Sequence, residues 1–237
     1  MYIYIIKYDK IDFSVIIPRN NINDIQCSSD YVSKLYVLIW RILSLIFAMI
    51  TIISLFVYTK TALGFAFYTI WNYIIFIIYY ACSSILSYKE YKRRNGNIMD
   101  DGINRLRKFI WILFLIECSN ALLICLVVWF LLYPIADSND RRIILHFSSL
   151  SMHNINFICL LIDLMITRIP IPFYGGIYAL LFVSVYGVFA IIFYNTYGIW
   201  TYPFLDYSIP FNAIMLLGVF LFHYICYLFI VLCAYLR

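Results

Sequence analysis

The sequence predicts an all-α integral membrane protein, a bundle of six transmembrane helices with both termini in the cytoplasm. Hydrophobic residues make up 65% of the 237 residues and charged residues only 12%, whereas a soluble domain carries about 25% charge. The apolar runs are long and continuous, without the alternation that a membrane barrel strand needs. Because lipid offers no partner to bare backbone groups, such a chain is expected to span the membrane as helices.

The expected organisation is a polar tail followed by one membrane domain. Residues 1–32 form the tail, and its opening stretch, MYIYIIKYDKIDF, is too short and too soon charged to be a cleavable signal peptide. Residues 33–237 form a single six-helix domain in which we find no internal repeat. The expected spans are residues 33–58, 62–87, 109–133, 143–167, 176–195 and 211–236.

The distribution of basic residues predicts the orientation in the membrane. With the tail in the cytoplasm, 13 of the 17 lysines and arginines lie in cytoplasmic segments. Only Lys60, Arg141 and Arg142 lie in segments on the outer side of the membrane, and Arg41 lies within the first span. Such a bias follows the positive-inside rule. The cluster KEYKRRNGN adjoins a span, so it indicates topology and attraction to anionic lipid rather than nucleic-acid binding. The lipid bilayer is the expected partner, and no nucleic acid is expected.

The cysteines and histidines predict neither a disulfide framework nor a cofactor. Six of the seven cysteines fall inside the expected spans and no CxxC pair occurs, which is typical of thiols that pack as small apolar groups. Three histidines are too few for two bis-histidine haem sites and form no convincing zinc pattern. We therefore expect no metal and no cofactor.

The fourth expected span carries a polar stripe. A polar stripe facing lipid costs several kcal/mol per buried group, so this one is expected to face the bundle interior or a wet cavity. Packing between helices through hydrogen bonds is the simpler interpretation, and a catalytic or binding site is the other. Positions alternating by three and four residues along the stripe are His146, Ser149, His153, Asn156, Leu160, Asp163 and Thr167.

A hydroxyl and a histidine are the minimum for hydrolysis by a covalent intermediate. The second expected span offers Thr69, within GFAFYTIWNYIIF, and Thr69 shares a helix face with Asn72. Both spans enter from the outer side. Thr69 lies about 10 Å and His153 about 15 Å below the expected starts of their spans, so the two can share one level of the membrane.

Several segments resemble one family. FYTIWN, MHNIN with LLID, IPIPFYGGIYALLF and YGIWTYPFLDY resemble the superfamily of rolling stone proteins and of the androgen-induced and androgen-dependent transmembrane hydrolases of fatty acid esters. The resemblance covers most of residues 60–210. It implies that Thr69 is the nucleophile, that His153 is its base, and that the substrate is a fatty acid ester of a hydroxy fatty acid.

Other residues are candidates for supporting roles. Asn72, Ser149 or Asn156 could donate a hydrogen bond to the oxyanion, and Glu117 could orient His153. Asp163 is a candidate pocket residue. Tyr202 and Asp206, in the aromatic outer loop TYGIWTYPFLDYSIP, could form a lid. Arg41 is expected to extend its guanidinium to the cytoplasmic interface.

Two other functions stay open at this stage. The histidine motif, H-x-x-N (His153 and Asn156), is closer to rolling stone, and this similarity implies a non-enzymatic role in cell adhesion or myoblast fusion. A small transporter that uses Asp163 and Glu117 as proton sites is the third possibility. The sequence does not distinguish the plasma membrane from the endoplasmic reticulum, and it leaves the oligomeric state open.

Overall fold

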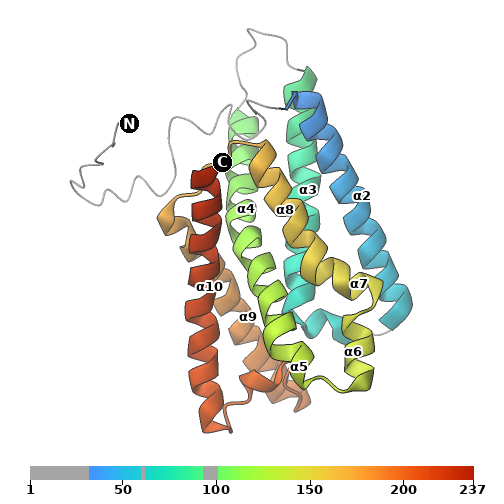
Figure 1. Ribbon diagram of the computed structural model, residues 1–237, viewed down its shortest axis with the longest axis vertical. Coiled ribbons are helices and arrows are strands. Elements are labelled where there is room, and N and C mark those ends of the chain that lie inside the picture. Colours follow the sequence, from blue (N-terminus) through green and yellow to red (C-terminus); the bar gives the residue numbers. More distant parts are fainter. Residues whose placement is uncertain (1–31, 60–61, 93–100) are drawn as a thin grey trace, which may run out of the picture.

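The computed structural model describes residues 32–59, 62–92 and 101–237, and it confirms the expected helical fold. Six of its helices are long and apolar enough to cross a membrane, and the described residues contain no strand. The tail expected at residues 1–32 lies almost wholly outside the described residues. Figure 1 shows that the six spans run alternately up and down, so that residue 34 and the C-terminus lie at the same end of the bundle.

The spans are built from the following helices. The first three are α2 (Lys34–Thr59), α3 (Tyr68–Lys92) and α4 (Asp101–Val127), and α4 continues through the π-helix η3 (Val128–Leu132) and α5 (Tyr133–Ile135). The fourth comprises α7 (Phe147–Leu150), the π-helix η4 (Ser151–Ile155) and α8 (Asn156–Ile166). The fifth and sixth are α9 (Gly176–Tyr197) and α10 (Pro210–Leu236). The connections contain η2 (Ala62–Ala66), α6 (Ser138–Ile144), η5 (Phe173–Gly175) and η6 (Pro203–Leu205).

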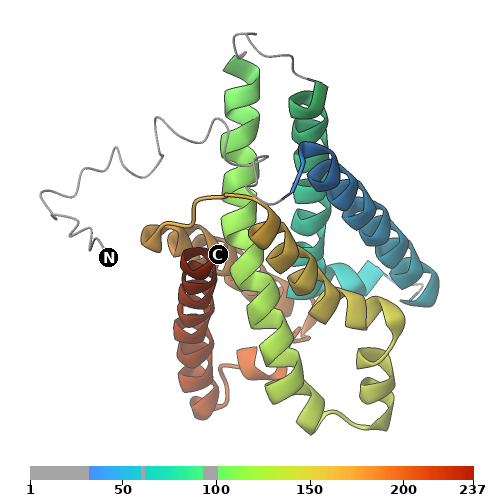
Figure 2. The same cartoon turned by 45° about the horizontal axis from the view of Figure 1, so that its top comes forward.

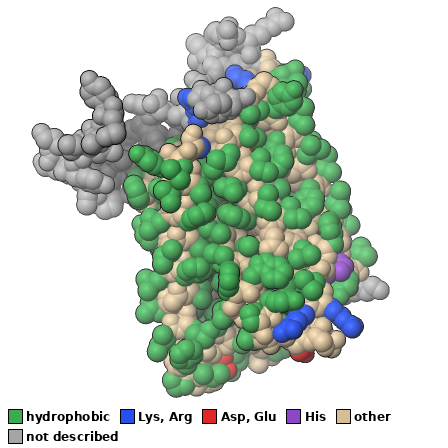
Figure 3. Space-filling view, in the orientation of Figure 1, with side chains coloured by type: hydrophobic (Ala, Val, Ile, Leu, Met, Phe, Trp, Pro, Cys, Tyr) green, Lys and Arg blue, Asp and Glu red, His purple; other side chains and the backbone are tan. Residues whose placement is uncertain are grey.

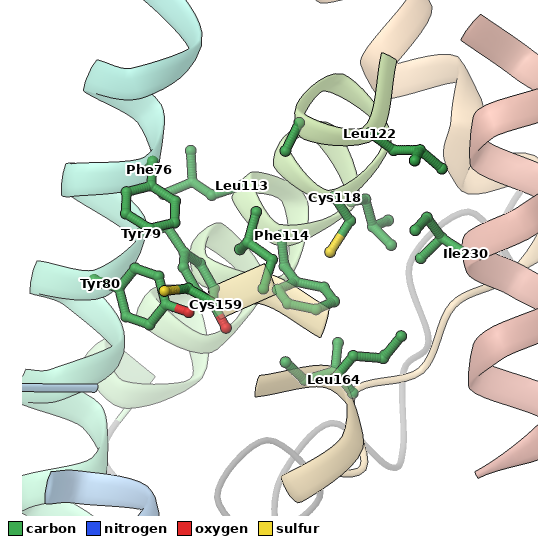
Figure 4. Packing of buried hydrophobic residues seen from close by; sticks show 14 of the residues in the cluster. Phe76, Tyr79, Tyr80, Leu113, Phe114, Cys118, Leu122, Cys159, Leu164 and Ile230 are labelled. Atoms are coloured by element: carbon green, nitrogen blue, oxygen red, sulfur yellow. The ribbon is translucent and has the colours of Figure 1, made fainter. Parts of the chain in front are cut away.

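Helix α4 lies at the centre of the bundle. It contacts α3, α8, α9 and α10, while α2 packs against α3, α7 and α8. Helices α2, α3, α4 and α8 therefore enclose one interior, and α9 and α10 pack against the outer side of α4. Figure 4 shows this interior, where Phe76 and Tyr79 of α3 face Phe114 of α4 and Cys159 of α8.

The surface has the pattern of a membrane protein. One flank is mostly hydrophobic, and the basic side chains lie near its two ends (Figure 3). The ends of α3 and α4 extend beyond the other helices at the end that holds the C-terminus (Figure 2). There the Arg107 guanidinium pairs with the buried Glu90 carboxylate, which ties the two extended helices together.

Two spans begin later than the sequence predicts. The second begins at Tyr68 rather than residue 62, because residues 62–66 form the separate 3-10 helix η2. The Trp71 indole N–H donates to the Phe65 carbonyl at 2.8 Å and holds η2 against α3. The fourth begins at Phe147 rather than residue 143, because the chain bends after α6. His146 accepts from the Ser148 backbone N–H at 3.4 Å and thus caps α7.

Arg41 does not reach the interface, so the prediction for it is wrong. Its side chain is fully buried, its Nε lies 3.2 Å from Asp163 Oδ1, and its Nη1 donates to Ser87 Oγ at 2.7 Å. The second Asp163 oxygen accepts from the Tyr79 hydroxyl. Asp163 is fully buried among the spans and has charged and hydroxyl partners, so it is a structural residue here rather than part of a pocket. A buried carboxylate needs such a partner because lipid cannot solvate it.

We predict that breaking this ion pair destabilises the bundle. Arg41→Met or Asp163→Leu alone leaves an unpaired buried charge and should lower the free energy of unfolding by about 3–5 kcal/mol. The double variant removes both charges and should recover most of that loss. Reversible unfolding in mixed detergent micelles measures all three. Single variants within about 1 kcal/mol of the wild type, the usual size of an exposed pair, would contradict the prediction.

Candidate functional site

Thr69 is the second residue of α3 and lies on the face that the helix turns inward. Tyr73 and Phe76 follow it at helical spacing and are fully buried. Thr69 itself is half-buried, because the helix begins only one residue earlier. The outer loop covers it there, since the Tyr202 phenol lies close to Thr69. Burial raises the pKa of the Tyr202 phenol, and the polar groups of Thr69 and Tyr68 partly oppose the rise.

Hydrogen bonds hold the loop around Tyr202 in place. The Tyr186 hydroxyl of α9 donates to the Ala66 carbonyl at 3.0 Å and lies 2.9 Å from Thr201 Oγ1. The Asn212 amide, one turn into α10, donates to the carbonyls of Pro203 and Asp206 at 2.9 and 3.0 Å. These hydrogen bonds stabilise the loop in a conformation that keeps Tyr202 next to Thr69.

The Asp206 side chain fastens this loop instead of reaching Thr69. Its Oδ1 accepts from the Ser208 backbone N–H at 2.9 Å and from the Ser208 hydroxyl at 2.6 Å. These two donors lower the pKa of the Asp206 carboxyl. Of the two predicted lid residues, Tyr202 lies against Thr69, and Asp206 shapes the turn before α10.

His153 lies in the π-helix η4 and is half-buried. Its Nδ1 lies 3.4 Å from Ser149 Oγ, so Ser149, a predicted supporting residue, is the neighbour that can orient the imidazole. The next residue, Asn154, points elsewhere and accepts from the Trp129 indole at 2.6 Å. The wide turn of η4 changes the helical rotation before Asn156.

Thr69 and His153 lie at similar depth on neighbouring elements. Helix α3 contacts η4, and α3 and α8 run in the same direction (Figure 1). The Tyr79 hydroxyl and the Asp163 carboxylate meet between these helices. Thr69 and His153 each precede that contact by ten residues, or about 15 Å of helix. Within the described part of the chain, however, no hydrogen bond joins their side chains: Thr69 lies next to Tyr202, and His153 has Ser149 as its neighbour.

Asn72 and Glu117 form a pair with each other. The Asn72 amide donates to Glu117 Oε1 at 2.7 Å, and both side chains are fully buried. Glu117 therefore has Asn72 as its partner rather than His153, the residue that it was expected to orient. Asn156 is also fully buried, and its Oδ1 accepts from the Phe157 backbone N–H at 2.7 Å.

The polar stripe of the fourth span is regular only in its inner half. Along α8, Asn156, Leu160 and Asp163 follow one another on the buried face. His146 lies at the bend before α7, where its ring stacks on Tyr58 with the centroids 3.9 Å apart. The bend and the π turn interrupt the expected alternation, so the stripe does not extend as one face from His146 to Thr167.

Three polar residues of this interior were not among the predicted site residues. Arg41 and Asn120 are fully buried, and Tyr68 nearly so. Asn120 had a signal in the sequence, because it follows Glu117 by three residues within an apolar span and so shares its face. The pairing of Arg41 with Asp163 had none, because 122 residues separate the two in the chain.

The chain matches no family model, no curated protein and no solved structure. The resemblance described above therefore rests on its motifs alone.

We predict that Tyr202 limits access to Thr69. In Thr69→Cys, a small membrane-permeant maleimide should label position 69 several times faster when Tyr202 is also changed to Ala, because the covering phenol is removed. Mass spectrometry of the peptide measures the labelling rate. Tyr207→Ala, which alters an exposed ring of the same loop, is the matched control and should leave the rate unchanged. Equal rates with and without Tyr202 would contradict the cover.

Proposed function

We propose that the protein is a multi-pass membrane hydrolase of lipid esters, with fatty acid esters of hydroxy fatty acids as the substrate class. Thr69 is the nucleophile and His153 is its base. The observation that carries the proposal is the equal depth of these residues, each ten residues before the Tyr79–Asp163 contact on parallel neighbouring helices. Six apolar spans suit a substrate that is itself dissolved in the bilayer.

The proposed reaction proceeds through an acyl-threonine. A lipid ester enters from the side of the bundle, and His153 accepts the Thr69 proton as the oxygen attacks the ester carbonyl. His153 returns that proton to the alcohol oxygen as the alcohol part leaves, and water later cleaves the acyl-threonine. Ser149 orients the imidazole, and the Tyr202 phenol, beside Thr69, is the best-placed donor to the oxyanion. Loss of one such donor typically lowers the rate by about 10²–10³.

No hydrogen bond joins the two groups in this structure, so their direct approach requires a movement of side chains. Rotation of Thr69 away from Tyr202 and of His153 away from Ser149 would direct both into the space between α3 and η4. Catalytic hydrogen bonds commonly form only when substrate is bound. The substrate ester, which would bind between Thr69 and the Tyr202 phenol, supplies the reason for this movement.

The proposed orientation places both termini in the cytoplasm. The structure sets residue 34 and the C-terminus at one end, and the basic residues in the sequence favour that end as cytoplasmic. Thr69 and His153 then lie in the outer half of the membrane, either in the plasma membrane or in the endoplasmic reticulum.

The ion pair of Asp163 weakens the transport hypothesis. The Arg41 guanidinium and the Tyr79 hydroxyl occupy both oxygens of this carboxylate, so Asp163 already serves as a contact between helices. A non-enzymatic role in adhesion or fusion remains the main alternative, and the following experiment separates it from hydrolysis.

We predict that a fluorophosphonate probe labels the purified wild-type protein and does not label Thr69→Ala. His153→Ala should slow the labelling by about 10²-fold or more, because a general base typically contributes that much. Thr196→Ala, which removes an exposed α9 hydroxyl bonded to its own helix, is the matched control and should label normally. Labelling that persists in Thr69→Ala would exclude Thr69 as the nucleophile, and an unlabelled wild type would favour the non-enzymatic role.

A further inference from the structure

A group of buried polar side chains lies beside Thr69, between α3, α4 and α8, and extends toward α9 at Tyr68, whose ring packs on Tyr186. We call this group the polar chamber: Tyr68, Asn72, Glu117, Asn120 and Asn156. Asn72, Glu117, Asn120 and Asn156 are fully buried, and Tyr68 is nearly so. The one hydrogen bond between members of the group joins Asn72 to Glu117. The chamber lies about 4.5 Å along α3 from Thr69, since Asn72 follows Thr69 by three residues.

The face of α4 that carries Glu117 is directed at Tyr68. Asn120 lies three residues beyond Glu117 on that face. Ile124 and Val128 continue the same face and pack with Tyr68 in one cluster. Tyr68 and Asn120 therefore lie along the same α4 face as the Asn72–Glu117 pair.

Asn156 reaches this level from α8. The Tyr79 hydroxyl and the Asp163 carboxylate fix the relative position of α3 and α8. Asn72 and Asn156 each lie seven residues before that contact, on helices that run in the same direction. Seven residues are about two turns, so both amides lie on the same faces as Tyr79 and Asp163 and at equal depth.

Most polar atoms of the chamber have no partner among the described residues. The unpaired acceptors are Asn72 Oδ1, Glu117 Oε2 and Asn120 Oδ1, the unpaired donors are Asn120 Nδ2 and Asn156 Nδ2, and the Tyr68 hydroxyl is also unpaired. Leaving such atoms unsatisfied inside a membrane protein costs about 1–3 kcal/mol each. The chamber is therefore built to hold a small polar guest.

The unpaired atoms include both donors and acceptors, and this mixture determines which small molecule the chamber can bind. A cation would satisfy the oxygen atoms and leave the two amide N–H₂ groups unpaired. Water both donates and accepts, and a buried water typically makes about three hydrogen bonds to groups of this kind. Water can thus pair with the unpaired acceptors and the unpaired donors of the chamber alike.

We propose that the polar chamber binds water and delivers it to the acyl-threonine. This second role rests on the proposed function. The water oxygen forms a bond to the acyl carbon as the bond from that carbon to Thr69 Oγ breaks. The proton lost by water passes to His153 and then to Thr69 Oγ, and the fatty acid leaves.

Hydroxyl-radical labelling by millisecond X-ray pulses tests the water site in the full chain. Internal water produces radicals in place, so Tyr68 should be oxidised several times faster than Tyr79, a fully buried tyrosine whose hydroxyl is already bonded to Asp163. Asn120→Leu should remove that excess, and Ser119→Ala, on the α4 face toward His223, should retain it. Glu117→Gln should retain it too, because the amide still pairs with water. Equal oxidation of Tyr68 and Tyr79, or an excess that survives Asn120→Leu, overturns the water site. Loss of the excess in Glu117→Gln overturns it in favour of a cation.

Burst kinetics with a chromogenic ester test the delivery of water. Wild-type protein should release one equivalent of alcohol in a burst and then turn over steadily. Asn120→Leu should keep the burst and lower the steady rate about tenfold or more, while Ser119→Ala matches the wild type. A steady rate unchanged in Asn120→Leu overturns the delivery role. A wild type that shows no burst and no turnover refutes the hydrolase instead, and the radical labelling still decides whether the chamber holds water.

Discussion

The Arg41–Asp163 ion pair is the contact on which the arrangement of the bundle depends. It joins α2 to α8, and the Tyr79 hydroxyl adds α3 through the second carboxylate oxygen. Hydrophobic packing between apolar helices fixes their relative positions weakly in lipid, because the acyl chains are as apolar as the side chains. A buried charge pair has one acceptable geometry. The ion pair therefore sets the axial position of α3 against α8. That position in turn sets the depth of every polar residue nearer the outer end of these helices.

The polar region at this ion pair and the polar region two turns away differ in how completely their polar atoms are paired. At the ion pair itself the charged atoms are matched, since Arg41 has carboxylate and hydroxyl partners. Two turns away, at Asn72 and Asn156, amide groups outnumber their partners within the described residues. The ion pair tolerates little substitution, because loss of either side chain leaves the other buried charge without a partner. The second region leaves hydrogen-bonding capacity free for the water that we propose it binds.

The sequence predicted the fold class because composition and the length of apolar runs are sufficient to identify membrane helices. It also placed Ser149 on the same helix face as His153 and named Tyr202 as a candidate lid residue. It failed where the structure depends on local turns. The 3-10 helix before Tyr68 and the π turn at 151–155 leave no gap in hydrophobicity, so the apolar pattern continues through them. The partner of Arg41 was missed because contacts between distant helices have no periodic signal in one chain.

The π turn in the fourth span separates sequence changes in its outer half from the register of its inner half. An ordinary helix transmits any insertion, deletion or twist along its whole length, so a change near the outer end would disturb the charge pair within. The extra residue of η4 absorbs such a change locally. The outer half of the span, with His153, can thus be reoriented by substitution while α8 keeps its register. Substitutions in the outer half of the span can therefore accumulate without disturbing the Arg41–Asp163 ion pair.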